Sequence, residues 1–104
     1  MNRDEKLQEA LRTSAAEFLA REANRNNLLT VTRVELSDAG KRATIFVSVF
    51  PESGEEAALK FMNRNKGEFA KFFIEHTRGA RAPKVEFTID LGEKNRRRLD
   101  ELSN

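Results

Sequence analysis

The stretch of residues 58–84 constrains the fold of this chain more than any other part of the sequence. Its apolar residues recur every three or four positions, which is typical of one face of an α-helix. These positions are Ala58, Leu59, Met62, Phe69, Phe72, Phe73 and His76. The run Asn65-Lys66-Gly67 interrupts the pattern and ends in glycine, which disfavours a helix. The spacing therefore predicts two consecutive helices that meet at a changed angle.

The net positive charge of the chain is concentrated in this stretch. Its net charge is +5, because seven cations stand against only Glu68 and Glu75, whereas the whole chain carries +2. The cations are Lys60, Arg64, Lys66, Lys71, Arg78, Arg81 and Lys84. A basic run is commonly a solvated helix face, with acids paired to cations three or four residues away. Seven cations exceed what two acids can pair, so the pattern favours an anionic partner such as nucleic acid.

Length and composition limit the remaining choices. A chain of 104 residues predicts one domain over residues 1–104, with a single modest core. The absence of cysteine excludes disulfides and thiolate chemistry. The first ten residues lack the apolar core of a signal peptide, and no run approaches the roughly 20 apolar residues of a membrane span. We therefore expect a cytoplasmic protein with no membrane partner.

The chain before the basic stretch predicts one helix and a hairpin. Residues 4–23 carry an apolar stripe at helical spacing, and the asparagines at 24–27 are expected to end that helix. Residues 28–37 and 43–50 are rich in β-branched residues and flank a short glycine-containing turn, which predicts an antiparallel hairpin. Ser53 is the expected cap of the next helix, with acids in its first turn.

A third strand follows the basic stretch. Ala82-Pro83 favours extended backbone, and Val85, Phe87 and Ile89 alternate with polar residues. Residues 91–104 are expected to form either a short terminal helix or a flexible basic tail. The predicted fold class is α+β in the order α-β-β-α-α-β, with a three-stranded mixed sheet covered by helices on one face, because a parallel return needs a helical crossover.

Catalytic chemistry finds little support. The single histidine, His76, shares a helix face with three phenylalanines, where a packing role or a helix-end position is far more common than general acid–base catalysis. One histidine and scattered carboxylates do not form metal-ligand spacing, and the glycines are too dispersed for a phosphate-binding loop. We expect no enzyme activity, no cofactor and no small-molecule substrate.

Gly67 is the most informative glycine. A glycine between two apolar helix faces predicts a turn, a positive φ or a close backbone approach by a partner. It can serve as a plain kink that lets both helices wrap the core, or it can expose backbone amides and Lys66 to a phosphate. The phenylalanines nearby are expected to be mostly core, so base stacking is not the expected mechanism. Four phosphate contacts would give binding a log–log salt slope of roughly −3 to −4.

The order and spacing of these segments resemble the ribosome-binding factor A family, which has a type II KH-like fold. The similarity covers nearly the whole chain, including the hairpin TVTRVELS to ATIFVSVF and the strand entry ARAPKVEFTID. The family has an Ala-x-Gly kink between its helices, and Asn65-Lys66-Gly67 falls at that place with Asn65 in the alanine position. Arg81 lies one residue closer to Pro83 than is usual, and Asp38 directly follows Ser37 where the family has Ser-x-Asp.

This resemblance implies a non-enzymatic ribosome-assembly factor. Its partners would be the small (30S) ribosomal subunit and 16S rRNA during late maturation and rRNA processing, with a link to growth in the cold. It also implies the sheet order 3-1-2, with the third strand parallel to the first. The family kink maps onto Asn65, Lys66 and Gly67, whereas the other candidates come from charge alone. The expected RNA-binding residues are Arg64, Asn65, Lys66, Gly67, Lys71, Arg78, Arg81 and Lys84.

A second hypothesis is a KH-like protein-interaction or homodimerisation module without an rRNA role. An exposed sheet edge, or an apolar patch formed by Phe46 or Phe50, would pair with another chain. The RNA hypothesis instead expects a monomer.

Overall fold

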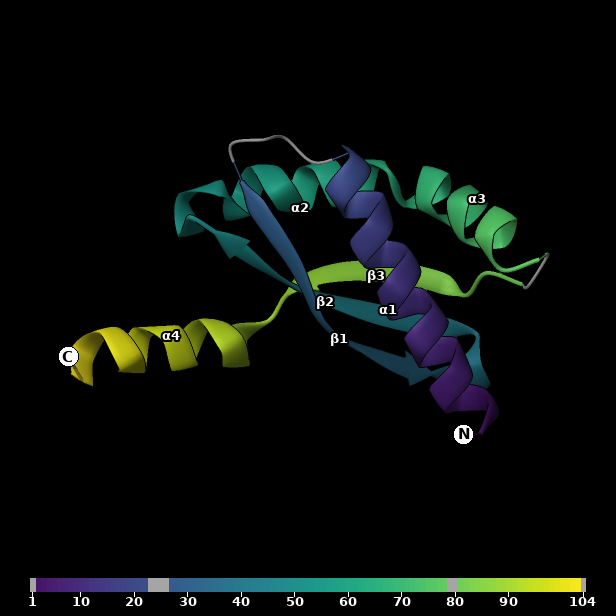
Figure 1. Cartoon of the computed structure of the whole chain (residues 1–104), viewed down its shortest axis with the longest axis horizontal. Coiled ribbons are helices and arrows are strands. Elements are labelled where there is room, and N and C mark those ends of the chain that lie inside the picture. The colour runs from purple at the N-terminus through teal and green to yellow at the C-terminus, as the bar shows by residue number, and fades with distance from the viewer. Residues whose placement is uncertain (1, 23–26, 79–80, 104) are drawn as a thin grey trace.

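The computed structural model describes residues 2–22, 27–78 and 81–103. Each helical or alternating pattern of the sequence corresponds to one element of the structure (Figure 1). The elements in chain order are α1 (Arg3–Glu22), β1 (Leu28–Ser37), η1 (Asp38–Gly40), β2 (Arg42–Phe50), η2 (Glu52–Gly54), α2 (Glu55–Arg64), α3 (Lys66–His76), β3 (Lys84–Ile89) and α4 (Leu91–Ser103). None of these helices is long and apolar enough to cross a bilayer. Of the expected helix stop at 24–27, only Asn27 lies within the described residues.

The three strands form a mixed sheet in the order β1-β2-β3. β1 pairs with β2 antiparallel, and β3 pairs with β2 parallel, so that Ala43 lies opposite Val85 and Ile45 opposite Phe87. The predicted α+β architecture is confirmed, but the expected order 3-1-2, with the third strand parallel to the first, is wrong, because β3 is parallel to β2 and runs opposite to β1. β2 leads into α2 and α3, and the shortest return places β3 on the free edge of β2 rather than beyond β1.

A β-bulge sets which residues of β1 face the core. The pairing register shifts between Val31 and Arg33, which leaves Thr32 as the extra residue. The bulge changes the alternation, so that Val31 pairs with Val47 and Val34 with Ile45 on the same face. Without the extra residue, the apolar side chains on the two sides of Thr32 would point to opposite faces of the sheet.

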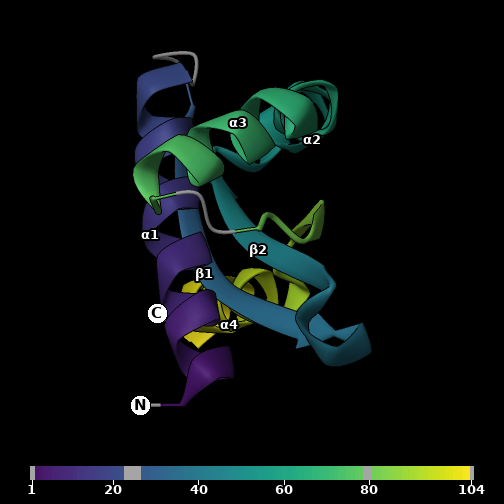
Figure 2. The ribbon, with the colours of Figure 1, turned by 90° about the vertical axis from the view of Figure 1, so that its right-hand side faces the viewer.

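Three helices, α1, α2 and α3, cover one face of the sheet (Figure 2). α1 packs along β1 and against α3, while α2 contacts β3. Phe69 is fully buried at the centre, with its ring 5.5 Å from that of Phe18 and 5.7 Å from that of Phe87. The expected apolar stripe of the first helix is confirmed, because Leu11, Ala15 and Leu19 are buried.

The start of α2 differs from the prediction. Ser53 lies within η2 and is not the cap; Gly54 occupies the N-cap position without a side-chain hydrogen bond. A Cβ at this position would lie 2.4 Å from Oδ1 of Asn27, so a larger residue would displace that side-chain amide. The expected acids in the first turn are present as Glu55 and Glu56.

A terminal helix, α4, follows β3 and projects from the end of that strand (Figure 1). Asp90, just before the helix, is its cap. The buried Oδ1 of Asp90 accepts a 3.1 Å hydrogen bond from the backbone N–H of Glu93, as a helix cap does. Nζ of Lys94 lies 2.8 Å from Oε1 of Glu55, and Arg98 lies 3.2 Å from Glu52. These two ion pairs tie α4 to η2 and to the start of α2.

Candidate nucleic-acid interface

Asn65 alone separates α2 from α3. Its backbone N–H donates to the carbonyl oxygens of Phe61 at 3.1 Å and Met62 at 3.2 Å, and its own carbonyl accepts from Phe69 at 2.9 Å. Its side-chain Nδ2 also donates to the Phe61 oxygen at 2.8 Å. The residue therefore ends one helix and begins the next. The predicted interruption of three residues was too long, because Lys66 and Gly67 are already helical.

Gly67 has no structural requirement for glycine among the described residues. It lies in the first turn of α3 at a negative φ, and a Cβ would meet nothing within 4 Å. The predicted turn or positive φ is therefore wrong. The change between the two helices falls at Asn65, and close approach by a partner at Gly67 stays a prediction.

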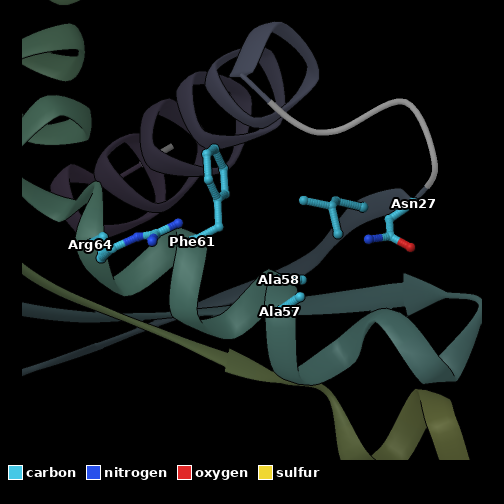
Figure 3. Close-up of a pocket in the computed structure, with 6 residues that line it drawn as sticks. Asn27, Ala57, Ala58, Phe61 and Arg64 are labelled. Atoms are coloured by element: carbon cyan, nitrogen blue, oxygen red, sulfur yellow. The ribbon is translucent and has the colours of Figure 1, made fainter.

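The cations around this junction differ in how they are engaged. Lys66 lies 3.4 Å from Glu86 on β3, and exposed Lys71 lies 3.8 Å from Glu68. Arg64, at the end of α2, is exposed and has no ion pair within the described part of the chain. Figure 3 shows Arg64 beside Phe61, with Asn27 across a hollow of about 220 Å³ whose floor includes Ala57 and Ala58.

The remaining predicted cations lie away from the junction. Arg78 follows the end of α3 in a left-handed conformation with φ of 58°. Arg81 is exposed beside the β1–β2 turn, and Lys84 is exposed at the start of β3, where its N–H donates to the carbonyl of Lys41 at 2.9 Å. The structure thus forms a junction group of Arg64, Asn65, Lys66, Gly67 and Lys71 and a second group of Arg81 and Lys84 at the start of β3, while Arg78 follows the end of α3.

Further cations accompany the second group and were not predicted from the sequence. Arg3 and Lys41 line the same hollow as Arg81, and Arg42 lies opposite Lys84 in the strand register. The parallel pairing of β2 with β3 brings these residues together. The only available signal was the Lys41-Arg42 pair at the hairpin turn, since the other members are about 40 residues away in sequence.

The aromatic side chains do not form a stacking platform. Phe69, Phe72 and Phe73 are buried, as expected. Phe46, on the uncovered face of the sheet, has the guanidinium of Arg33 3.8 Å from its ring centroid. Recognition through phosphates suits this surface better than base stacking.

His76 lies at the carboxyl end of α3. Its ring stacks on Phe72 at 3.9 Å, and Nδ1 lies 2.8 Å from the Phe72 carbonyl oxygen. Within the described residues, no three His, Asp or Glu side chains come together as a metal site. The packing role predicted for His76 matches this geometry.

The α-β-β-α-α-β order of the elements, the three helices on one face of a mixed sheet and the basic junction between α2 and α3 define a small domain of the KH-like class. The family model for ribosome-binding factor A matches residues 3–103. The chain therefore belongs to the ribosome-binding factor A family.

Relatives and solved structures agree with this assignment. Ribosome-binding factor A of Coprothermobacter proteolyticus is 31% identical over 85% of this chain and 66% of the relative, and that of Kosmotoga olearia is 28% identical over 95% and 80%. The crystal structure of the Thermus thermophilus protein matches with a TM-score of 0.69, at 29% identity over 81% of this chain and 92% of that one. A Thermus thermophilus homology model fitted into a cryo-electron microscopy map of a complex with the 30S subunit matches with a TM-score of 0.70, at 30% identity over 80% and 90%.

Proposed function

We propose that this protein binds the small ribosomal subunit through 16S rRNA and acts as an assembly factor during its late maturation. The observation that carries the proposal is the similarity, over 80% of the chain, to the Thermus thermophilus protein fitted into a map of a 30S complex. Family membership over residues 3–103 extends the similarity to α4.

The helix junction supplies the contact in this proposal. Gly67 has open space around it, so an RNA backbone can approach the first turn of α3 closely. The free N–H groups of that turn and the positive end of the helix dipole favour a phosphate. Lys66 and Arg64 lie on the two sides of Asn65 and add charge, while Lys71 follows one turn further on. Such contacts hold the RNA without reading its sequence.

The proposed role is binding in the cytoplasm, without catalysis. The ring of His76 is engaged with its own helix through Phe72, which leaves it poorly placed to exchange protons with a substrate. The junction has neither a carboxylate pair nor a histidine to serve as a general acid and base among the described residues.

One observation favours the second candidate, a protein-interaction module. Leu28 and Phe50 lie opposite each other at the open end of the hairpin, and they are 65% and 63% exposed. A dimer through this pair predicts a molecular mass that rises with concentration and returns to that of a monomer in Phe50→Ser. A constant monomeric mass would argue against it.

Sedimentation of cell lysate tests the main proposal. We expect the protein to migrate with small subunits or their precursors at low salt and to dissociate as salt rises, because phosphate contacts release counterions. Lys66→Glu should weaken this co-migration. Lys60→Glu is the matched control, because Lys60 is 71% exposed on α2 and is paired with Glu56. A wild-type protein that remains at the top of the gradient in both salts would contradict the proposal.

A further inference from the structure

A second basic surface lies at one end of the molecule, where the start of α1, the β1–β2 turn and the segment entering β3 meet (Figure 1). These three segments enclose an open hollow of about 440 Å³. Arg3, Lys41 and Arg81 line it, and Asp4 is the one acidic residue in its lining. The end of the molecule that carries this hollow faces the viewer in Figure 2.

The three cations that line this hollow have no side-chain partners among the described residues. Within residues 2–22, 27–78 and 81–103, none of Arg3, Lys41 and Arg81 makes a side-chain ion pair or hydrogen bond. By contrast, Lys66 and Lys71 at the helix junction are both paired with glutamates. Three like charges around one hollow repel one another, so a bound anion would relieve this repulsion.

Further cations extend the surface along the sheet. Arg42 and Lys84 are partners in the parallel register, next to Lys41. Lys84 is two strand residues, or roughly 7 Å, from Glu86, where the side chain of Lys66 reaches β3. Lys84 therefore extends the positive charge of the hollow along β3 as far as Glu86, which pairs with Lys66 of the junction. A row of this length fits a polyanion better than a single phosphate ion.

The hairpin turn holds Lys41 in place. Asp38, Ala39 and Gly40 all have positive φ, at 52°, 53° and 82°. For the two residues with a Cβ this conformation is unfavourable. It turns the chain toward α1, where Gly40 lies close to Leu7. Lys41 is thus presented by a turn of defined backbone conformation, and Arg3 by the first turn of α1.

We propose that this hollow binds backbone phosphates of RNA, as a second contact surface besides the helix junction. The inference rests on the proposed function and extends the RNA footprint along β3 to the β1–β2 turn. The cations of the hollow position the RNA by charge, with no reading of bases.

The test measures binding of purified small subunits as a function of salt, with two double variants of equal charge. Lys41→Gln with Arg81→Gln removes two cations of the hollow. Arg12→Gln with Arg96→Gln removes two exposed cations that are paired with Glu9 and Glu93 elsewhere. The hollow variant should bind about tenfold or more weakly near 0.1 M salt, and its log–log salt slope should fall by roughly 1.4–1.8. The control should retain wild-type affinity, and both variants should retain the wild-type melting temperature.

Each other outcome has a definite meaning. Equal affinity and slope for the two double variants would overturn the second surface while the proposed function stands. If the hollow variant bound subunits weakly but bound protein-free 16S rRNA as the wild type does, the hollow would contact a ribosomal protein and the inference would be wrong. Failure of the wild-type protein to bind subunits would overturn the proposed function as well.

Discussion

The hydroxyl of Thr32 donates a 2.6 Å hydrogen bond to Oδ2 of Asp90, which is only 5% exposed. Thr32 is the extra residue of the bulge in β1, which is one edge strand of the sheet. Asp90 follows β3, the other edge strand, and caps α4. This bond therefore joins the irregularity in the sheet to the start of the terminal helix. The Thr32 hydrogen bond is the main reason that the pKa of Asp90 lies below its usual value, with contributions from the N–H of Glu93 and the charge of Arg33.

Thr32→Val is expected to lower the free energy of unfolding by about 1–2 kcal/mol at neutral pH, because a buried carboxylate loses a hydrogen-bond donor. Since the pKa of folded Asp90 is depressed, its charged form stabilises the fold above the unfolded pKa of about 3.9, and this contribution is lost as the pH falls through the folded value. The difference between wild type and variant should thus be full at pH 7 and shrink below about pH 4. Urea unfolding across this pH range measures it.

Thr32→Ser is the matched control, because it retains the hydroxyl. It should lose less stability than Thr32→Val and keep the wild-type dependence on pH. A loss in Thr32→Val that stayed constant down to pH 2 would show that the hydroxyl acts through packing rather than through the carboxylate of Asp90.

Most elements of the fold could be predicted because they depend on local periodicity. The strand at 43–50 alternates with period two, and the helix at 4–23 carries one apolar stripe, so each segment specifies its own buried face. The strand order could not be obtained in this way. It depends on which edge of β2 receives β3, and the sequence of β3 is equally compatible with either edge.

The candidate site was only partly predictable for the same reason. Arg64, Lys66 and Gly67 are neighbours in sequence, so a helix junction keeps them together. Arg3 and Arg81 are far apart in sequence and meet only because α1 packs along β1 and β3 returns beside β2. No local pattern carries that information.

Phe69→Ala should be strongly destabilising. The ring is fully buried between Phe18 and Phe87, and removal of a buried aromatic side chain lowers the free energy of unfolding by about 3–5 kcal/mol. Denaturant unfolding at 25 °C measures the loss. Phe50→Ala is the control, because this side chain is 63% exposed and its truncation should change stability by less than about 1 kcal/mol. Similar losses in the two variants would contradict the described core.

Gly67→Ala should separate stability from binding. An alanine in the first turn of α3 meets open space and should raise the free energy of unfolding by about 0.5–1 kcal/mol. The added methyl group should nevertheless weaken binding to small subunits, because it occupies the space through which the RNA backbone approaches. Thr13→Ala, at an exposed position of α1, is a control that also improves helix propensity. If both variants bound subunits as the wild type does, close approach at Gly67 would be excluded.

The Lys94–Glu55 pair should determine how firmly α4 is attached to the domain. Both side chains are less than one-fifth exposed, and within the described residues Oε2 of Glu55 is buried without a hydrogen-bond partner. Lys94→Met should therefore lower the free energy of unfolding by about 2 kcal/mol, because the carboxylate is left without its cation. Backbone amides of α4 should also exchange hydrogen faster, since local opening of the helix becomes easier.

A double-mutant cycle with Glu55→Gln measures the coupling directly. We expect it to exceed that of Glu93 with Arg96, an exposed pair within α4 whose coupling should be about 0.2–1 kcal/mol. Because the exposed pair lies within a single helix, it does not oppose detachment of α4, whereas the Lys94–Glu55 pair spans two elements. Equal coupling energies, or unchanged exchange in α4, would mean that Asp90 and the backbone of β3 hold this helix without help from the ion pair.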